Sequence, residues 1–374
     1  MIYADNAATT KLDMDAFEAM KPFLFEDYGN ASQSYSFSRT SKKALRWARQ
    51  SIANCINAEP EEIYFTSGGT ESDNWAIKGC MESSSTYQSI ITSEFEHHAV
   101  LNACKHMEYC GYSVAYLHPS KEGFVTPEIL DRIITDDASL VSVMMVNNEI
   151  GTIQPIKKLC EIAHQHGGIF HTDAVQAVGH IGIDVKDLNV DMLSCSAHKF
   201  NGPKGIGFLY IKKGIAMLPY MEGGAQEFGM RAGTENIASI VGMATALTKN
   251  VAAIDDNREY LGILEQIILQ RLYVTGVNFI RNGAEPYVPG NLSLSFKGFE
   301  GEMLLHRLDL MGIMVSTGSA CDSKNTQISH VLKAIEADEK YALGTIRISL
   351  GRDNTNDEAV KIAEALISIL KKMD

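Results

Sequence analysis

The strongest constraint on the fold is an alternation, between residues 40 and 215, of short apolar runs with segments of helical periodicity. Residues 41–57 place Leu45, Ala48 and Ile52 at the three-to-four spacing of an amphipathic helix. Comparable helical segments separate apolar runs at residues 63–66, 89–92, 114–117, 140–146, 169–172, 191–196 and 206–211. Apolar strands separated by helices are typical of a sheet buried on both faces. The sequence therefore predicts an α/β fold with a mostly parallel mixed sheet between helices.

The pattern changes after residue 235, and a chain of 374 residues is too long for one simple core. Residues 291–296 alternate apolar and polar side chains, which predicts a strand with one face in water. The other elements predicted in this half are helices at 237–249, 257–273, 301–311 and 355–373 and strands at 313–315 and 345–350. We expect a large domain over residues 15–255 and a smaller α+β domain formed by residues 1–14 and 256–374, with the boundary at 251–256.

Composition and charge exclude several classes of function. The formal net charge of −13 argues against nucleic-acid binding, because phosphate backbones attract basic surfaces. No apolar run approaches the roughly 18–20 residues of a membrane span, and the first residues carry no leader pattern, so we expect a cytoplasmic protein without a membrane partner. The seven cysteines form no CxxC pair, and the histidines at 164, 166 and 171 share no face. We therefore expect no metal site.

Two residues that follow apolar runs suggest a specific chemistry. Lys199 comes after the run 191–196, where a strand gives way to a Gly/Pro turn, and Asp173 ends the run before it. A desolvated lysine loses its proton readily and can form a Schiff base with an aldehyde. A nearby carboxylate can hold a pyridinium nitrogen protonated. Although a lone lysine after a strand is usually a solvated turn residue, the pair together predicts a pyridoxal phosphate site.

Other polar residues are predicted to lie at the same edge of the sheet. The turn at residues 66–71 joins a strand to a helix, and its Gly69 and Thr70 can bind a single phosphate with backbone N–H groups and a hydroxyl. His97 follows a strand and can stack on a flat ring, although a lone histidine is more often structural. The carboxyl ends of parallel strands meet at one edge, so we expect a second set of side chains to gather there: Asn148, Gln176, Ser196 and His198.

Two further residues are candidates for contacts with a substrate. Cys321 lies in the small, polar run 316–323, where a thiol has the access to solvent and substrate that a nucleophile needs. Arg347 interrupts an apolar, alternating strand. A guanidinium in such surroundings is expected to bind a carboxylate, and an amino-acid substrate supplies one in bidentate geometry. An ion pair with an acid of the protein itself is an equally good interpretation of Arg347.

Taken together, these motifs resemble the cysteine desulfurases, which are fold-type I pyridoxal-phosphate enzymes of the class V aminotransferase group. The resemblance extends over nearly the whole chain, from Tyr3 to Arg352. The residues that carry it are the runs 3–10, 66–74, 96–97, 146–151, 173–176, 196–199, 231–234 and 316–321.

The resemblance implies a role for each matched residue. Lys199 would bind pyridoxal phosphate as a Schiff base and then move the Cα proton, Asp173 would pair with the ring nitrogen, and His97 would stack on the ring. Cys321 would take the sulfur of L-cysteine, which leaves L-alanine and a persulfide. The remaining roles are phosphate binding (Gly69, Thr70, Ser196, His198 and, from the second subunit of a homodimer, Thr234), contact with the ring oxygen side (Gln176, Asn148) and binding of the substrate carboxylate (Arg347, Asn148).

The same resemblance implies a protein partner that accepts sulfur, either an iron–sulfur scaffold or a thiolation protein. The distance along the chain from Cys321 to Val331 suits the longer loop of the iron–sulfur-assembly group. The chain departs from the common pattern at Ala31, Tyr35 and Asp322. Asp322 places a negative charge beside the thiol, which should raise the pKa of Cys321.

Two alternatives remain open at this stage. The chain could be a selenocysteine lyase or another class V enzyme, such as a transaminase, which would not need Cys321. It could also be a protein that binds the cofactor but has lost catalysis.

Overall fold

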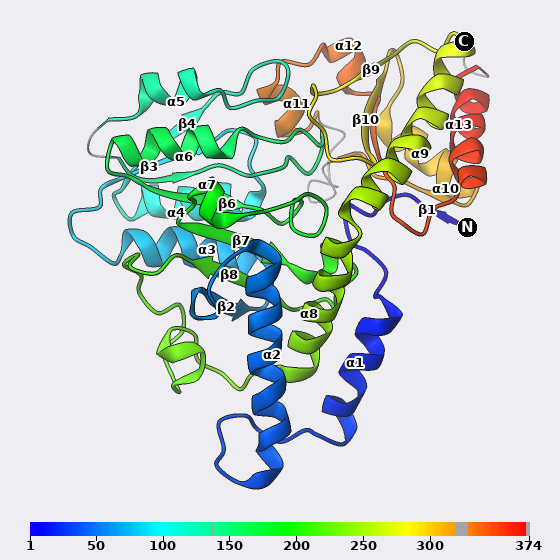
Figure 1. The fold of residues 1–374 in the computed structure, drawn as a ribbon. Helices are drawn as coiled ribbons and strands as arrows, with labels where there is room; N and C mark the ends of the chain where they lie inside the picture. The colour runs from blue at the N-terminus through cyan, green and yellow to red at the C-terminus, as the bar shows by residue number, and fades with distance from the viewer. Residues whose placement is uncertain (136–137, 319–327, 372–374) are drawn as a thin grey trace.

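The computed structural model describes residues 1–135, 138–318 and 328–371. Its largest sheet is built from β2 (Ile63–Thr66), β3 (Ser89–Ser93), β4 (Ser113–Leu117), β5 (Ala138–Ser142), β6 (Ile169–Asp173), β7 (Met192–Ser196) and β8 (Gly207–Ile211). The strand order is β2-β8-β7-β6-β5-β3-β4 (Figure 1). From β7 to β4 all neighbours are parallel, whereas β8 is antiparallel to β7 and β2. This confirms the prediction of a mostly parallel, mixed sheet.

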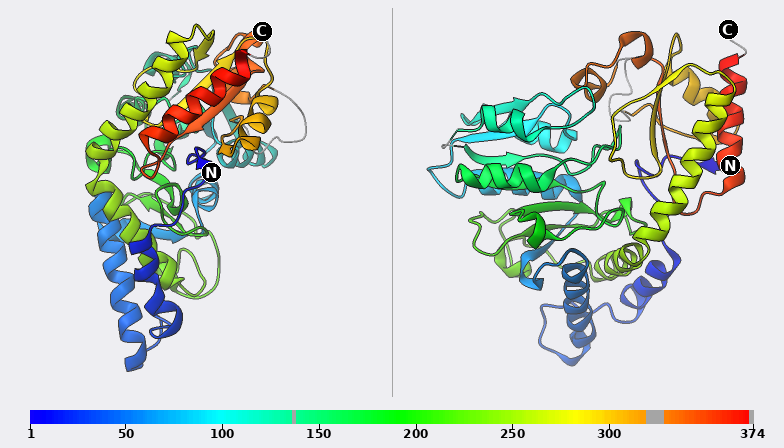
Figure 2. Two further views of the ribbon diagram at one scale, coloured as in Figure 1. Left: turned by 90° about the vertical axis from the view of Figure 1, so that its right-hand side faces the viewer. Right: turned by 45° about the horizontal axis from the view of Figure 1, so that its top comes forward.

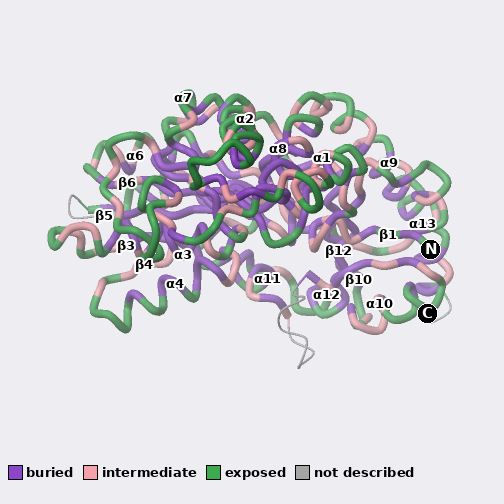
Figure 3. The backbone as a smooth tube through the Cα atoms, turned by 90° about the horizontal axis from the view of Figure 1, so that it is seen from below, coloured by how far each residue is buried: buried purple, intermediate pink, exposed green. Residues whose placement is uncertain are grey.

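Helices cover both faces of this sheet. They are α1 (Met14–Phe25), α2 (Arg39–Ile56), α3 (Gly69–Met81), α4 (His98–Tyr109), α5 (Pro127–Ile133), α6 (Ile156–Gln165), α7 (Val185–Leu188) and α8 (Ile237–Ala252). Successive strand residues face opposite layers. Leu140 and Met192 pack with α3 and α4, while Val141 and Leu193 pack with α2, α6 and α8. The middle strands β6, β7 and β8 are therefore buried on both faces along almost their whole length, and Figure 3 shows the buried middle of the molecule.

A second apolar core lies among the elements that follow α8 (Figure 2). The elements that follow α8 are α9 (Ile254–Val274), β9 (Phe279–Arg281), β10 (Asn291–Phe296), α10 (Gly301–Leu310), β11 (Ile313–Met314), α11 (His330–Ala334), α12 (Glu339–Ala342), β12 (Thr345–Ser349) and α13 (Asn356–Lys371). The buried residues of α11 and α12 pack in the core of the large sheet instead of the second core. Strands β12, β10 and β9 form an antiparallel sheet, and β11 pairs in parallel with β1 (Ile2–Tyr3). The N-terminal residues thus pack in the same core as the C-terminal helix.

Two strands differ from the sequence-based prediction. All six residues of β10 are buried, although alternation predicted one face in water. Its serines are buried because they find partners inside the protein: Asn282 Nδ2 donates to Ser293 Oγ (3.0 Å) and Ser295 Oγ (2.8 Å). The predicted strand 140–146 is shorter in the structure, because β5 ends at Ser142. Beyond this residue the backbone N–H groups of Val143 and Met145 still donate to carbonyl groups of β6.

The test for membrane-spanning segments gives one finding. In the described part of the chain, no single helix has the length and apolar character needed to cross a bilayer. Helices α8 and α9 meet at a bend of 71°, and only the two together have the length and composition of a membrane-spanning segment.

Candidate active site

The carboxyl ends of β5, β6 and β7 lie side by side and open onto a cavity of about 310 Å³. Ligand pockets in proteins start at about this size. Ten residues predicted from the sequence line the cavity together: Gly69, Thr70, His97, Asn148, Asp173, Gln176, Ser196, His198, Lys199 and Arg347. Thr234 does not line it but lies in a smaller cavity beside Ser67 and Arg231. Cys321 is outside the described residues, although Gly318 lines the main cavity.

One end of the cavity is a cup formed between β2 and the N-terminus of α3. Gly68 has a φ of +148°, and a Cβ atom at this position would lie 3.3 Å from Ser196 Oγ. Glycine therefore allows the turn to lie directly against the end of β7. The helix N-terminus and the hydroxyl groups of Thr70 and Ser196 form a donor set suited to a phosphate.

Lys199 follows β7 on a short 3-10 helix, Ala197–Lys199. Its Nζ donates to the carbonyl oxygens of Ala7 (2.6 Å) and Ala8 (2.8 Å). Gln176 Nε2 also donates to Ala7 O (3.0 Å). The segment that follows β1 therefore reaches across to the end of the large sheet and completes the wall of the cavity.

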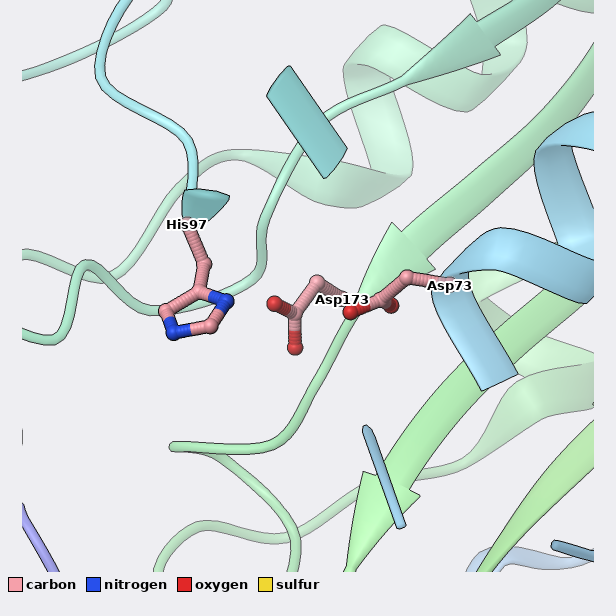
Figure 4. Close-up of side chains that lie close together, drawn as sticks. All are labelled: Asp73, His97 and Asp173. Carbon is pink, nitrogen blue, oxygen red and sulfur yellow. The ribbon is translucent and has the colours of Figure 1, made fainter. Parts of the chain in front are cut away.

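Asp173 and His97 face one another inside the cavity (Figure 4). Val175 N donates to Asp173 Oδ1 at 2.9 Å. Burial raises the pKa of Asp173, while the neighbouring His97, the Val175 hydrogen bond and Lys199 act against this rise. Burial is also the main cause that lowers the pKa of His97. His97 Nδ1 accepts from Ala99 N at 3.1 Å, so the proton of the neutral ring is on Nε2.

His198 lies beside the cup, and its Nδ1 is 3.1 Å from Thr9 Oγ1. Burial, together with the positive charge of Lys199, lowers the pKa of His198 to about 4. At neutral pH this imidazole is therefore uncharged, and it can contribute a hydrogen bond to a phosphate but not a positive charge.

Arg347 is buried on β12 and faces both the cavity and the N-terminal segment. Its Nη2 donates to Asp5 Oδ1 (2.8 Å), and its Nη1 donates to the carbonyl oxygen of Asn148 (2.9 Å). The ion pair with an acid of the protein, which was one of the two interpretations of Arg347, is thus present. A substrate carboxylate at this position has to share the guanidinium with Asp5.

Four further ionisable residues line the cavity and had not been singled out as site residues from the sequence: Asp73, His98, Glu149 and His330. Asp73 lies one helical turn after Gly69, so the spacing alone places it on the same face of α3 as the cup. Glu149 accepts from Ser329 Oγ at 2.6 Å, and the rings of His98 and His330 lie 4.8 Å apart. These contacts join distant segments, which no local pattern could indicate.

The histidines weighed as metal ligands do not come together. His164 Nε2 lies 2.7 Å from Asp191 Oδ2. His171 lies between β5 and β7, where it bonds Ser142 Oγ (2.8 Å) and Ser194 Oγ (2.9 Å).

The residues present fit pyridoxal phosphate. The cup offers neutral donors to a phosphate, Asp173 offers a buried carboxylate to a ring nitrogen, and Lys199 offers an amine on the same wall of one cavity. Asp73 and Asp173 are both buried here, which is costly without a cationic or donor group between or beside them.

Comparisons with known proteins show the family to which the chain belongs. The family model "Aminotransferase class-V" matches residues 2–362. The chain is 45% identical over 373 residues to cysteine desulfurase IscS of Methanosarcina thermophila, a match that covers 100% of this chain and 92% of that protein. It is 46% identical over 374 residues to cysteine desulfurase IscS of Dictyoglomus turgidum, with 100% and 95% covered.

Solved structures show the same likeness. A NifS-like protein superposes with a TM-score of 0.93 at 36% identity, covering 99% of both chains. A structure described as SspA in complex with cysteine superposes with a TM-score of 0.84 at 34% identity, covering 94% of this chain and 99% of that one.

Proposed function

The chain belongs to the class V aminotransferase family and, within it, to the cysteine desulfurases, which are pyridoxal-phosphate-dependent enzymes. From this we propose that its cavity binds L-cysteine and that its residues remove the sulfur atom, leaving L-alanine. The observation that carries the proposal is the convergence of Lys199, Asp173 and the phosphate cup on one cavity. A solved relative that is described as a complex with cysteine supports the choice of substrate.

We propose the following roles for the residues that would hold the cofactor. Gly69, Thr70, Ser196 and His198 bind its phosphate, Asp173 pairs with its ring nitrogen, His97 stacks on the ring, and Gln176 and Asn148 face its oxygen side. When bound, pyridoxal phosphate supplies an electron-withdrawing ring that makes the substrate Cα–H acidic.

The remaining groups act on the substrate. Arg347 and the Asn148 side chain bind its carboxylate, with Asp5 as the competing partner of the guanidinium. Lys199 takes the Cα proton and returns it, because its amine is on the cavity wall. The Cys321 thiolate attacks the sulfur of the substrate: a new S–S bond forms and the Cβ–S bond breaks. The electron pair of the broken bond stays with the substrate, whose Cβ takes up a proton and becomes the methyl group of L-alanine, and the persulfide remains on Cys321.

The proposed homodimer rests on the surface around Thr234. Several large apolar side chains nearby are exposed: Leu218 (41%), Tyr220 (36%), Met221 (43%) and Phe228 (61%). An exposed apolar group of this kind is typical of an interface. In a homodimer Thr234 would complete the phosphate site of the second subunit, in accordance with its position outside the cavity of its own subunit. Sedimentation equilibrium tests this assembly.

We propose that the persulfide sulfur passes to an acceptor protein, either an iron–sulfur scaffold or a thiolation protein. Trapping of mixed complexes from cell extract distinguishes the two. The cytoplasmic location stays a prediction, which cell fractionation tests.

The central experiment measures L-alanine and sulfide released from L-cysteine in the presence of a reductant. Cys321→Ser should abolish release of both, whereas Cys110→Ser, a change at an exposed thiol outside the cavity, should leave turnover unchanged. Full turnover by the Cys321→Ser variant would contradict the proposed nucleophile.

Absorbance of the cofactor provides the second readout. Lys199→Ala should abolish the Schiff-base band of the purified protein. A parent protein that shows no such band after addition of pyridoxal phosphate would favour a chain that has lost catalysis. Selenide release from selenocysteine and amino-group transfer to a keto acid test the two enzymatic alternatives.

A further inference from the structure

Asp73 is a buried acid in the cavity that the proposed reaction does not use. It lies on α3, is 1% exposed and lines the cavity together with Asp173 and His97. The nearest ligand-capable atoms of these three residues are all within 4.8 Å of one another. In Figure 4 the Asp73 carboxyl group points toward Asp173, on the opposite side from His97.

Neither oxygen of Asp73 has a hydrogen-bond partner among the described residues. The nearest basic atom is His171 Nε2, at 3.7 Å from Oδ1. This imidazole supplies no charge, because burial lowers the pKa of His171 to about 3. Both of its nitrogens are engaged by serine hydroxyl groups. Among the described residues, an ionised Asp73 would therefore be a buried anion with no cation beside it. The one group that acts to lower its pKa is the hydroxyl of Ser194, which is already engaged by His171.

Asp173 has the surroundings of the ionised member of the pair. Burial raises the pKa of Asp173 as well, but His97, the hydrogen bond from Val175 N and Lys199 all act against that rise. For Asp73 the balance is the opposite: burial is the main cause that raises its pKa well above the ordinary value, the charge of Asp173 adds to the rise, and the Ser194 hydroxyl acts against it. Among the described residues, the titratable groups that face the pair are His171, Glu96, His97, Lys199 and, from β7, Cys195. Two interacting carboxyl groups of this kind bind their protons as a unit.

We propose that Asp73 is a neutral carboxylic acid that holds the single proton of the Asp73–Asp173 pair and so keeps Asp173 ionised toward the cavity. Asp73 is then a positioning residue that acts through Asp173. This inference rests on the proposed function only in that Asp173 faces the ring nitrogen of the cofactor. The location of the shared proton is a property of the protein without cofactor or substrate.

The first test is infrared spectroscopy of the cofactor-free protein at pH 7. The C=O stretch of a protonated carboxyl group should be weakened in Asp73→Asn. Glu96→Gln is the matched control, because burial raises the pKa of Glu96 to about 8 and this residue contributes a protonated carboxyl of its own. An unchanged protonated-carboxyl signal in a folded Asp73→Asn protein overturns the proposal.

The second test titrates the Asp73 signal with pH. In Asp173→Asn the neighbouring negative charge is gone, so the signal should titrate about one pH unit or more below its position in the parent. An unchanged midpoint shows that the two carboxyl groups are independent and contradicts the shared proton.

The third test measures pyridoxal phosphate affinity by equilibrium dialysis. Asp73→Asn keeps a neutral donor and should bind within about threefold of the parent, whereas Asp73→Leu lacks the donor and should bind about tenfold or more weakly. Equal weakening by Asn and Leu overturns the proposal. Because the infrared arm needs neither cofactor nor L-cysteine, a protein with the expected signals and no desulfurase activity contradicts only the proposed function.

Discussion

Replacement of Arg49 by Met should destabilise the large core strongly. Arg49 on α2 forms a bidentate ion pair with Glu227, with Nη2–Oε1 at 2.6 Å and Nη1–Oε2 at 2.9 Å. The two side chains are 10% and 4% exposed. The guanidinium also donates to Ile63 O and lies over the rings of Phe65 (4.5 Å) and Phe228 (5.2 Å). All of these contacts are lost in Arg49→Met.

The expected cost follows from what remains after the change. Glu227 would keep one donor, Phe65 N at 2.9 Å, and would otherwise be a buried, unpaired carboxylate. Removal of one partner of a buried ion pair costs about 3–5 kcal/mol. The pair also holds Glu227 and Phe228 at φ values of +45° and +59°, which few non-glycine residues adopt. Loss of the anchor therefore also releases the loop that leads to Thr234.

Thermal unfolding followed by circular dichroism measures the effect. A loss of this size should lower the melting temperature by roughly 4–6 °C, because the entropy of unfolding is about 2.1 cal/mol/K per residue and the chain has 374 residues. Arg46→Met, at an exposed position one turn earlier on α2, is the control and should change little. Arg49→Met/Glu227→Gln should recover part of the loss, since no unpaired charge stays buried. A loss below about 1 kcal/mol for Arg49→Met, in the range of an exposed pair, or a double variant no better than the single one, would refute the reasoning.

Three further outcomes are expected. Gly207→Ala should lower both the melting temperature and the affinity for pyridoxal phosphate, because the new Cβ would lie 2.3 Å from Cys195 O and 2.7 Å from Gly68 Cα and would displace the cup. A variant with the melting temperature and the affinity of the parent would contradict this prediction. In the parent, the buried Glu96 has its pKa raised to about 8, so the folded protein loses stability as the pH rises from the ordinary pKa of a glutamate to about 8. Glu96→Gln does not titrate, and its stability relative to the parent should therefore increase by up to about 1.4 kcal/mol per pH unit in that window. Urea unfolding at pH 5 and pH 8 measures the difference. Thr234→Val should bind pyridoxal phosphate about tenfold more weakly in the dimer, as expected for loss of a hydrogen bond to a charged group; an unchanged dissociation constant would place Thr234 outside the site.

Much of the site could be predicted from sequence because the relevant signals are local. A polar residue directly after an apolar run marks the end of a strand, and parallel strands bring such ends to one edge. Asn148, Asp173 and Lys199 were found in this way, and the structure places all three on one cavity. Asp73 could have been found by the same kind of reasoning, from its four-residue distance to Gly69 on α3.

The rest depended on contacts between segments far apart in the chain. Arg347 pairs with Asp5, 342 residues away, and Lys199 donates to carbonyl groups of Ala7 and Ala8. Alternation in β10 predicted exposure, but a neighbouring strand segment supplies Asn282 to its serines. Periodicity describes which side of an element is polar. It does not tell whether water or another side chain will satisfy that side.

The sequence by itself determined the order of strands and helices, the mostly parallel sheet and the chemical nature of the residues at its edge, because each of these follows from side-chain periodicity and short-range turns. Only the tertiary structure decided the partners of those residues: which acid faces Asp173, which carboxylate holds Arg347, and that Thr234 lies outside the main cavity. The physical reason is that charge balance and burial in the cavity depend on groups that folding alone brings within a few ångströms of one another.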